Sequence, residues 1–277
     1  MSGAVAVRHG SFGRASIYEL DKSLIPHGHR EGHLIFHLDG SPAIVTISGK
    51  DYVMDKNRAV AISPWEPHSF QVDPNACEPC VSLTLYIKPI WFLESSQRAE
   101  FSLNFGRAEI EMTDQIRQWT RRLTGQMLNE ESDSLFNSYL FETTSQCYKQ
   151  SWSGQQRSSI MKEMRTKFSD YRVRRSLQVM QNNFAEAIEM DSLARQVGLS
   201  RPHFFKLFKK QMGVTPNLYL NTLRSEKAIE YLMTTEKTVS DIGFDLGFSS
   251  QASFTRFFAS NVGIPPSDYR RVASAGA

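Results

Sequence analysis

The 277-residue sequence lacks the long apolar runs of membrane proteins and the cysteine content of secreted, disulfide-rich proteins. No run approaches the roughly 18 apolar residues that a membrane-spanning helix needs, and the apolar stretch before Arg8 is too short for a secretory signal. The three cysteines form an odd set, which argues against a disulfide framework and fits a reducing compartment. These absences predict a soluble, cytoplasmic protein with no membrane partner.

Little in the sequence supports cysteine chemistry. Cys77 and Cys80 have the CxxC spacing of redox and zinc motifs, but no second pair accompanies them and no strand-to-helix pattern surrounds them. A redox or zinc site is therefore the less favoured interpretation. We expect a loop in which two cysteines happen to fall close together.

The length predicts two domains, since domains of about 100 to 150 residues are the commonest. The small net charge of +3 is unevenly distributed between them. Residues 165–277 carry 16 Lys and Arg against 10 Asp and Glu, a balance of +6, whereas residues 1–164 carry 16 against 19, a balance of −3. The basic C-terminal part indicates a polyanionic partner such as nucleic acid.

The two parts also differ in their apolar spacing. Residues 16–88 alternate short runs such as AIVTIS, RAVAIS and CVSLTLYI with turn signals, as antiparallel strands of a small barrel or sandwich do. Residues 110–149 have helical spacing and predict two amphipathic helices, the first with Ile116, Trp119, Leu123 and Met127 and the second with Leu135, Tyr139 and Phe141 on its apolar side. SWSGQQRSS, at 151–159, has a linker's composition, and helices dominate from residue 169.

Two C-terminal segments repeat one pattern: LARQVGLSRPHFFKLFKKQMGVTPNLYL from Leu193 and IGFDLGFSSQASFTRFFASNVGIPPSDYR from Ile242. Each begins with a short helix that carries a small residue, Ala194 or Gly243, where helix backbones approach closely. A glycine follows, Gly198 or Gly247, which can take the positive φ of a sharp turn. A second helix is then fixed in the core by phenylalanines at i and i+4, namely Phe204 with Phe208 and Phe254 with Phe258. Each segment therefore predicts a helix-turn-helix.

The second helix of each segment leaves one face free, and that face carries side chains suited to DNA. Arg and Gln suit the edges of guanine and adenine in the major groove, and Lys and Ser suit phosphates. One such helix has the composition of an ordinary solvated surface, but two with matching turns and cores favour DNA binding. The predicted DNA-binding residues are Arg201, Pro202, Phe205, Lys206 and Lys209 in the first helix, and Ser250, Gln251, Ala252, Thr255 and Arg256 in the second. A helix over residues 218–233 would hold the two about 34 Å apart, the spacing of successive major grooves.

Residues 176–271 resemble the DNA-binding domain of the AraC/XylS family of bacterial transcription regulators. SRPHFFKLFKKQMGVTP resembles the family's first recognition helix and its exit turn. IGFDLGFSSQASFTRFFASNVGIPPSDYRR resembles its second unit, including the GF at the turn, F-x-R in the helix and the final G-x-x-P-x-x-Y-R. The resemblance implies that Pro202, Phe205, Lys206, Gln251, Ala252 and Arg256 contact bases or backbone.

The chain departs from the family pattern at two places. Gly243 stands where the family usually has Ala, and Ala259-Ser260 replaces a pair of lysines after the second recognition helix. We therefore expect the first unit, with Lys206, Lys209 and Lys210, to supply more of the electrostatic binding.

The N-terminal part resembles the cupin-like sensor barrel found in many of these regulators. HGHREGHLIFHLDG follows the spacing of the first cupin motif, with His33 in the acidic position, and SPWEPH lies where the second motif places its last ligand, although Asn57 replaces an expected Gly. Four imidazoles, those of His27, His29, His33 and His68, are thus candidates to converge on a divalent metal. The alternative is a small organic ligand bound without metal, with the histidines as polar lining. His37 has no motif role, and for Trp65, Trp91, Phe36 and Phe70 we favour the core over a pocket wall.

The sequence thus predicts an α+β protein: a cupin-like, ligand-sensing antiparallel β-barrel over 1–100, a helical dimerisation segment over 101–150, a linker over 151–168, and an all-α DNA-binding domain over 169–277 with two helix-turn-helix units joined by a helix. We expect a homodimeric transcription regulator that works as an activator, is controlled by a small molecule, and acts on double-stranded DNA and RNA polymerase. A metal-dependent cupin enzyme or metal sensor fused to a DNA-binding domain is the alternative. We expect no enzymatic activity, and a regulator that responds to no ligand is the remaining option.

Overall fold

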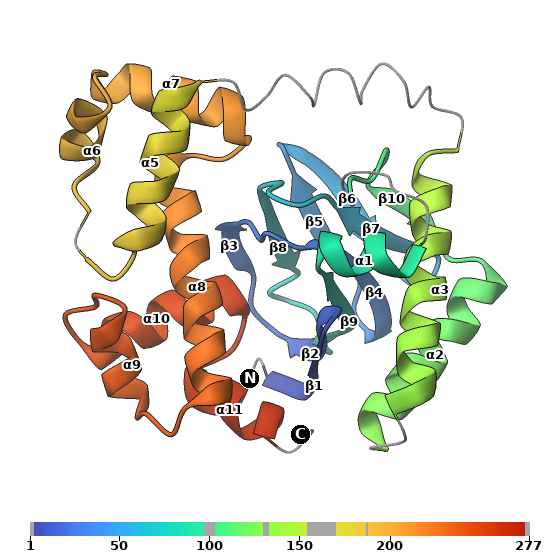
Figure 1. The fold of residues 1–277 in the computed structure, drawn as a ribbon. Coiled ribbons are helices and arrows are strands. Elements are labelled where there is room, and N and C mark those ends of the chain that lie inside the picture. Colours follow the sequence, from blue (N-terminus) through green and yellow to red (C-terminus); the bar gives the residue numbers. More distant parts are fainter. Residues whose placement is uncertain (1–2, 97–102, 130–132, 154–169, 187, 275–277) are drawn as a thin grey trace. The chain divides into compact units, whose positions relative to one another are not determined.

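The computed structural model describes residues 3–96, 103–129, 133–153, 170–186 and 188–274, which form two compact units (Figure 1). The first unit comprises Met1–Gln155 with Ser267–Ala277, and the second comprises Gln156–Pro266. Most of the predicted linker over 151–168 lies outside the described residues. No helix in the described part of the chain is long and apolar enough to cross a membrane.

The first unit is built on two antiparallel sheets, as the N-terminal sequence pattern predicts. Six strands form one sheet in the order β1-β2-β9-β4-β7-β10, and four form the other in the order β3-β8-β5-β6 (Figure 1). The strands are β1 (Gly3–Gly10), β2 (Gly13–Leu20), β3 (Leu24–His27), β4 (Gly32–Gly40), β5 (Ala43–Ile47), β6 (Lys50–Met54), β7 (Arg58–Ile62), β8 (His68–Val72), β9 (Cys80–Ile87) and β10 (Glu109–Glu111).

Strands begin earlier in the chain than the alternating sequence pattern from residue 16 predicts. The hairpin of β1 and β2 precedes most of the predicted β region, and its runs GAVAVRHG and GRASIYEL contain several Gly and Ala residues, which are poor strand formers. Pairing with β9 along its whole length incorporates β2 into the sheet, so tertiary context overrides local propensity here.

Three helices, α1 (Pro89–Ser96), α2 (Asp114–Leu128) and α3 (Asp133–Ser151), pack beside the strands of this unit. Phe12 at the β1–β2 turn contacts Trp91 of α1 and Phe136 of α3, with ring centroids 6.1 and 5.6 Å away. The predicted apolar side of α2 is confirmed at Ile116, Leu123 and Met127, which are buried. On α3 the prediction is wrong for Leu135, which is 53% exposed, because the buried stripe begins one residue later, with Phe136, Leu140 and Cys147.

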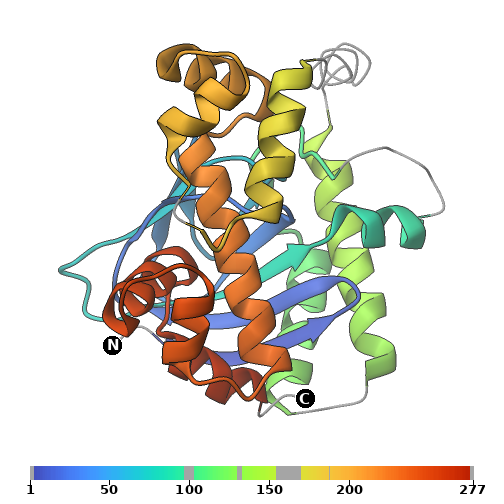
Figure 2. The ribbon, with the colours of Figure 1, turned by 60° about the vertical axis from the view of Figure 1, so that its left-hand side comes forward.

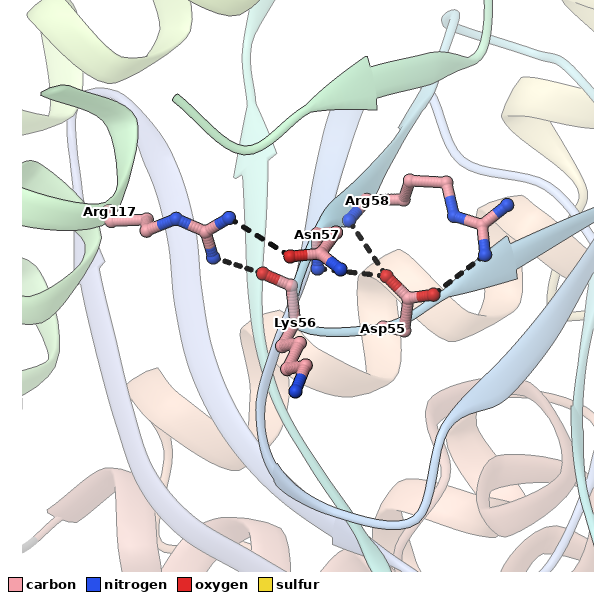
Figure 3. A network of polar contacts seen from close by, with 5 residues as sticks. All are labelled: Asp55, Lys56, Asn57, Arg58 and Arg117. Atoms are coloured by element: carbon pink, nitrogen blue, oxygen red, sulfur yellow. Dashed lines mark hydrogen bonds and ion pairs between the residues drawn. The ribbon is translucent and has the colours of Figure 1, made fainter. Parts of the chain in front are cut away.

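A polar network fastens α2 to the turn between β6 and β7 (Figure 3). The Asp55 carboxylate accepts from the backbone N–H of Asn57 at 2.8 Å and pairs with the Arg58 guanidinium at 2.7 Å. Arg117 of α2 donates to the Lys56 carbonyl and, at 3.2 Å, to the Asn57 side-chain oxygen. Among the described non-glycine residues only Ser48 and Trp65 have positive φ, so this turn does not need the glycine that the cupin pattern places at Asn57.

The second unit is helical, as predicted. It contains α5 (Tyr171–Asn182), α6 (Met190–Gln196), α7 (Arg201–Met212), α8 (Pro216–Thr234), α9 (Val239–Asp245) and α10 (Gln251–Val262). The pairs α6–α7 and α9–α10 are the two helix-turn-helix units, and α8 runs between them (Figure 2). The last helix, α11 (Pro266–Ser274), begins at the boundary and groups with the first unit.

The turns and cores of both units follow the sequence repeat. Gly198 and Gly247 have φ of +73° and +81°, which only glycine adopts without strain. The four phenylalanines at i and i+4 are fully buried. A methyl group at Gly243 would lie 3.0 Å from Cβ of Phe254, so glycine at this departure from the family pattern gives α9 and α10 their close contact.

Candidate functional site

Four histidines that lie far apart in the sequence meet inside the first unit. His27 ends β3, His68 begins β8 and is its direct partner across the sheet, His33 lies on β4 of the other sheet, and His29 lies in the loop between β3 and β4. All four side chains are buried. The structure therefore brings together every histidine that the cupin-like spacing selects.

The imidazole rings form one continuous cluster. His68 lies at the centre, with ring centroids 4.4 Å from His27 and 4.5 Å from His33. His29 lies 5.0 Å from His27 and 5.2 Å from His33. The His29 loop is held by a backbone bond from the N–H of Trp65, which has a φ of +64°.

Backbone hydrogen bonds orient two of the rings. Nδ1 of His27 bonds to the Ile25 carbonyl at 2.7 Å, and Nδ1 of His68 bonds to the Glu66 carbonyl at 2.8 Å. In each ring Nδ1 is therefore the donor, and Nε2 carries the free lone pair, which is how metal-binding histidines are commonly held. Nε2 of His29 and both ring nitrogens of His33 are buried without a partner among the described residues.

The cluster is neutral at physiological pH. Burial lowers the pKa of His27, and it lowers the pKa of His29, His33 and His68 well below the usual value. Mutual repulsion among the rings and the charge of Arg14 act in the same direction on His29 and His33. Neutral imidazole is the form that binds metal ions.

Three of the four histidines meet the geometric requirement for a shared metal ion. One ring nitrogen from each of His27, His29 and His68 lies within 4.8 Å of the others. Buried imidazoles with oriented Nδ1 atoms and unpartnered nitrogens fit a divalent transition metal such as Zn²⁺. The arrangement supplies nitrogen ligands only, because none of the described acidic residues belongs to this group.

The same interior contains polar side chains that are not among the residues predicted from the sequence. Arg14, Ser16 and Tyr18 alternate along β2, and Ser82, Thr84 and Tyr86 alternate along β9, directly opposite them. His33 is in turn opposite Tyr86, which places all of them on the inner face of the six-stranded sheet. These side chains could have been found from the sequence, because they occupy every second position of two strands. They are Arg, Ser and Tyr in GRASIYEL, and Ser, Thr and Tyr in CVSLTLYI.

The remaining candidates of the N-terminal part lie outside this cluster. Phe36, Phe70 and Trp91 are buried, as expected for core residues, and Trp65 is half-buried. His37 is half-buried and bonds to the Gly40 carbonyl at 3.1 Å.

The two cysteines of the CxxC pair are separated by their environments. Cys77 is exposed, whereas Cys80 is buried at the start of β9, where burial raises the pKa of its thiol to about 12. Cys80 therefore stays protonated at neutral pH, which disfavours redox or zinc chemistry at this pair.

In the second unit, the predicted DNA-binding residues lie along α7 and on the first half of α10, with Ser250 as the residue before α10 begins. On α7, Arg201, Pro202, Lys206 and Lys209 are exposed and Phe205 is half-buried. On α10, Gln251, Ala252 and Arg256 are exposed, whereas Ser250 and Thr255 are half-buried.

Two of these side chains also have local structural partners. Ser250 is the N-cap of α10, and its hydroxyl accepts from the backbone N–H of Ser253. Arg201 pairs with Asp191 at 2.9 Å, and both side chains are about half exposed to solvent. Such an exposed pair is weak, so it leaves Arg201 able to exchange partners.

Comparison with known protein families gives two matches that together cover most of the chain. Residues 193–272 match a helix-turn-helix domain, and residues 9–143 match an AraC-like ligand-binding domain. The HTH-type transcriptional activator RhaS of Escherichia coli is 25% identical over 261 residues, which cover 91% of this chain and 90% of RhaS. The transposon Tn10 TetD protein of Escherichia coli is 37% identical over 92 residues, or 33% of this chain and 67% of TetD.

Among solved structures, ToxT of Vibrio cholerae has a similar fold over nearly its whole length. An apo form of a ToxT variant gives a TM-score of 0.58 at 14% identity, covering 95% of this chain and 98% of that chain. A wild-type form bound to an unsaturated fatty acid gives 0.56 at 15% identity, covering 99% and 98%.

Proposed function

The chain belongs to the AraC family of DNA-binding transcription regulators, and from this membership we propose that α7 and α10 read DNA under the control of a small molecule held in the N-terminal barrel. It is a ligand-regulated activator and not an enzyme. The observation that supports the DNA-reading role is the duplicated helix-turn-helix. In both copies the recognition helix buries phenylalanines at the same two positions and exposes the equivalent opposite face.

The proposed roles follow from the chemistry of the exposed side chains. Arg256 and Gln251 can form paired hydrogen bonds with base edges, so we assign them to sequence recognition. Lys206 and Lys209 are exposed point charges suited to phosphates. Pro202, Phe205, Ala252 and Thr255 would make apolar contacts, and Arg201 and Ser250 would contact the backbone.

The helix between the two units supports a bipartite site. α8 has 19 residues, which corresponds to about 28 Å at 1.5 Å per residue. It packs against α7, α9 and α10. This stiff spacer is compatible with two recognition helices in successive major grooves, about 34 Å apart.

The sequence-reading role is tested by selecting binding sites from a random double-stranded DNA library with the full-length protein. We expect enrichment of one site with two short conserved elements about one helical turn apart. Arg256→Ala should relax the selected sequence in one element and weaken binding by about 1 to 3 kcal/mol. Recovery of no preferred sequence would overturn the proposal.

The charge of α7 can be tested separately through the salt dependence of binding. The double variant Lys209→Ala, Lys210→Ala should make the fall of log K for DNA binding with log salt less steep. The magnitude of the slope should decrease by about 0.9 for each DNA phosphate that the protein no longer neutralises. Lys50→Ala is the matched control, because Lys50 is an exposed lysine of β6 in the other unit. An unchanged slope in the double variant would refute the assignment of electrostatic binding to the first helix-turn-helix, α6–α7.

For the barrel we propose a divalent metal held by His27, His29 and His68, with His33 beside them, as part of effector binding. A bound metal would supply a Lewis-acidic centre for oxygen or nitrogen donors of the effector. Small-molecule binding on this fold has a precedent in ToxT, whose structure includes an unsaturated fatty acid. Elemental analysis of protein purified without a histidine tag tests the metal: we expect about one equivalent, absent from His68→Ala and retained in His37→Ala.

Effector binding is proposed to act through the helices around residues 101–150, which we assign to a homodimer interface. The network between Arg117 and the β6–β7 turn would transmit a change in the barrel to α2 (Figure 3). A dimer presents two double-headed DNA-binding units, whose spacing then sets which sites are occupied and how RNA polymerase is contacted. Cytoplasmic location follows from this role.

A further inference from the structure

The inner face of the six-stranded sheet contains a buried positive charge. Arg14 of β2 is only 6% exposed. Its guanidinium lies over the Tyr86 ring, 3.8 Å from the centroid, and donates to the Tyr269 hydroxyl at 3.2 Å. None of the contacts that Arg14 makes within the described part of the chain is with a carboxylate.

This charge has no paired counter-charge among the residues that the structure describes. An arginine cannot lose its proton at physiological pH, so the guanidinium stays cationic inside the barrel. Tyrosine rings and hydroxyls stabilise it in part, but they are neutral groups. Taking a charge out of water is far more costly than burying a neutral polar group, and an opposite charge is the usual compensation.

Several hydroxyl groups beside Arg14 have no hydrogen-bond partner in the described part of the chain. The side-chain oxygens of Ser16, Tyr18 and Ser82 are buried without a hydrogen-bond partner among the described residues, as is Nε of Arg14. Tyr18 lies directly opposite Ser82, and Ser16 lies between Arg14 and Tyr18 on the same face of β2. Water can satisfy hydroxyl groups, but it cannot neutralise the guanidinium.

We propose that the barrel binds a small organic carboxylate, whose carboxylate group is held by Arg14 and whose further oxygens bond to the hydroxyls of Ser16, Tyr18 and Ser82. This inference rests on the proposed function, in which the barrel is the effector site. One guanidinium beside neutral imidazoles matches a single negative charge better than the double charge of a phosphate. A row of hydroxyls favours a hydroxy or oxo acid over a purely apolar chain.

Arg14 also affects the histidine cluster. The Tyr86 ring that its guanidinium covers lies 5.1 Å, between ring centroids, from both His29 and His33, so Arg14 lies close enough to repel a metal cation bound there. A carboxylate on Arg14 would cancel this repulsion. Carboxylate and metal should therefore bind cooperatively, each raising the affinity for the other by the same factor.

The test is thermal unfolding of the full-length protein in EDTA, monitored by tryptophan fluorescence. Sodium acetate and sodium glycolate are the probes. All four tryptophans lie in the first unit, so the signal reports on the unfolding of that unit. We expect a saturable rise in Tm, about 5 °C or more at a hundredfold excess over Kd, with glycolate effective at lower concentration. Sodium chloride and sodium phosphate at equal ionic strength should give smaller, unsaturable changes.

Arg14→Gln should abolish the saturable response, while general salt effects remain in both proteins. Ser82→Ala removes a hydroxyl that has no partner among the described residues and should weaken glycolate binding about tenfold, and Ser69→Ala, half-buried on β8, is its matched control. If Arg14→Gln fails to fold, Ser82→Ala decides the matter on its own.

Equal responses of wild type and variants, no saturable response to either carboxylate, or a stronger response to phosphate would each overturn the inference. Site selection from the random DNA library is unaffected by these outcomes. If the DNA selection succeeds and the carboxylate test fails, the proposed function stands, but without this class of effector.

Discussion

Acidification should destabilise the barrel selectively, because it contains histidines that are neutral when folded. For His29, His33 and His68 burial holds the folded-state pKa well below the usual value, which is about 6.5 in an unfolded chain. Below that pH the unfolded state binds protons that the folded state does not. The stability of the barrel is therefore fully present above about pH 7 and declines as the pH falls.

The size of the effect follows from proton linkage. Between pH 7.5 and 5.5, each histidine that stays neutral in the folded state shifts the unfolding equilibrium about tenfold toward the unfolded state. The three histidines together give about 4 kcal/mol. His9, whose pKa burial lowers to about 4, acts in the same direction. Such a decrease is a large part of the stability of an ordinary domain.

Urea unfolding in EDTA at the two pH values, followed by tryptophan fluorescence, measures this decrease. His33→Leu should reduce it by about one third of the cluster's contribution, since both ring nitrogens of His33 lack partners among the described residues and the substitution breaks no hydrogen bond there. His203→Gln, at an exposed position of α7, is the control and should leave the decrease unchanged. A free energy of unfolding that stays constant or rises toward pH 5.5 would refute the assignment of neutral, desolvated histidines.

Two further predictions concern the helix-turn-helix units, and far-UV circular dichroism during urea unfolding checks both. Gly198→Ala should lower the free energy of unfolding by about 1 kcal/mol from the positive φ alone, because nothing lies within 4 Å of the added methyl. Gly247→Ala should lower it by at least twice as much, because that methyl would lie 2.1 Å from the Ala185 carbonyl oxygen. Equal destabilisation by the two substitutions would contradict this reasoning. Phe254→Ala should destabilise the unit by about 3 to 5 kcal/mol and Phe244→Ala, at a side chain 57% exposed, by far less; a reversed order would refute the core assignment.

The DNA-binding part was predictable from the sequence because its determinants are local. The i and i+4 phenylalanines, the turn glycine and the small residue of the first helix all lie within about 20 residues of each other. Burial of Phe204 and Phe258 and the positive φ of Gly198 confirm the pattern in detail. Helical contacts of this range follow from chain geometry alone.

The histidine cluster was partly predictable for a different reason. The spacing of His27, His29 and His33 is local and follows a motif, but their meeting with His68 requires β3 and β8 to pair at one particular register. A shift of one residue would turn His68 out of the barrel. The resemblance to a known barrel supplied that register, which spacing by itself does not determine.

The sequence by itself determined the order of domains, the duplicated helix-turn-helix and the candidate histidines, because each depends on residues close together in the chain or on a recognisable motif. Only the tertiary structure decided that Arg14 lies opposite Tyr86, in one row with His33 and among hydroxyls without partners in the described part of the chain. Strands β2 and β9 are separated by about 60 residues, and their pairing is fixed by the closure of the whole sheet. Which side chains share the barrel interior is therefore a property of strand register, which no local pattern specifies.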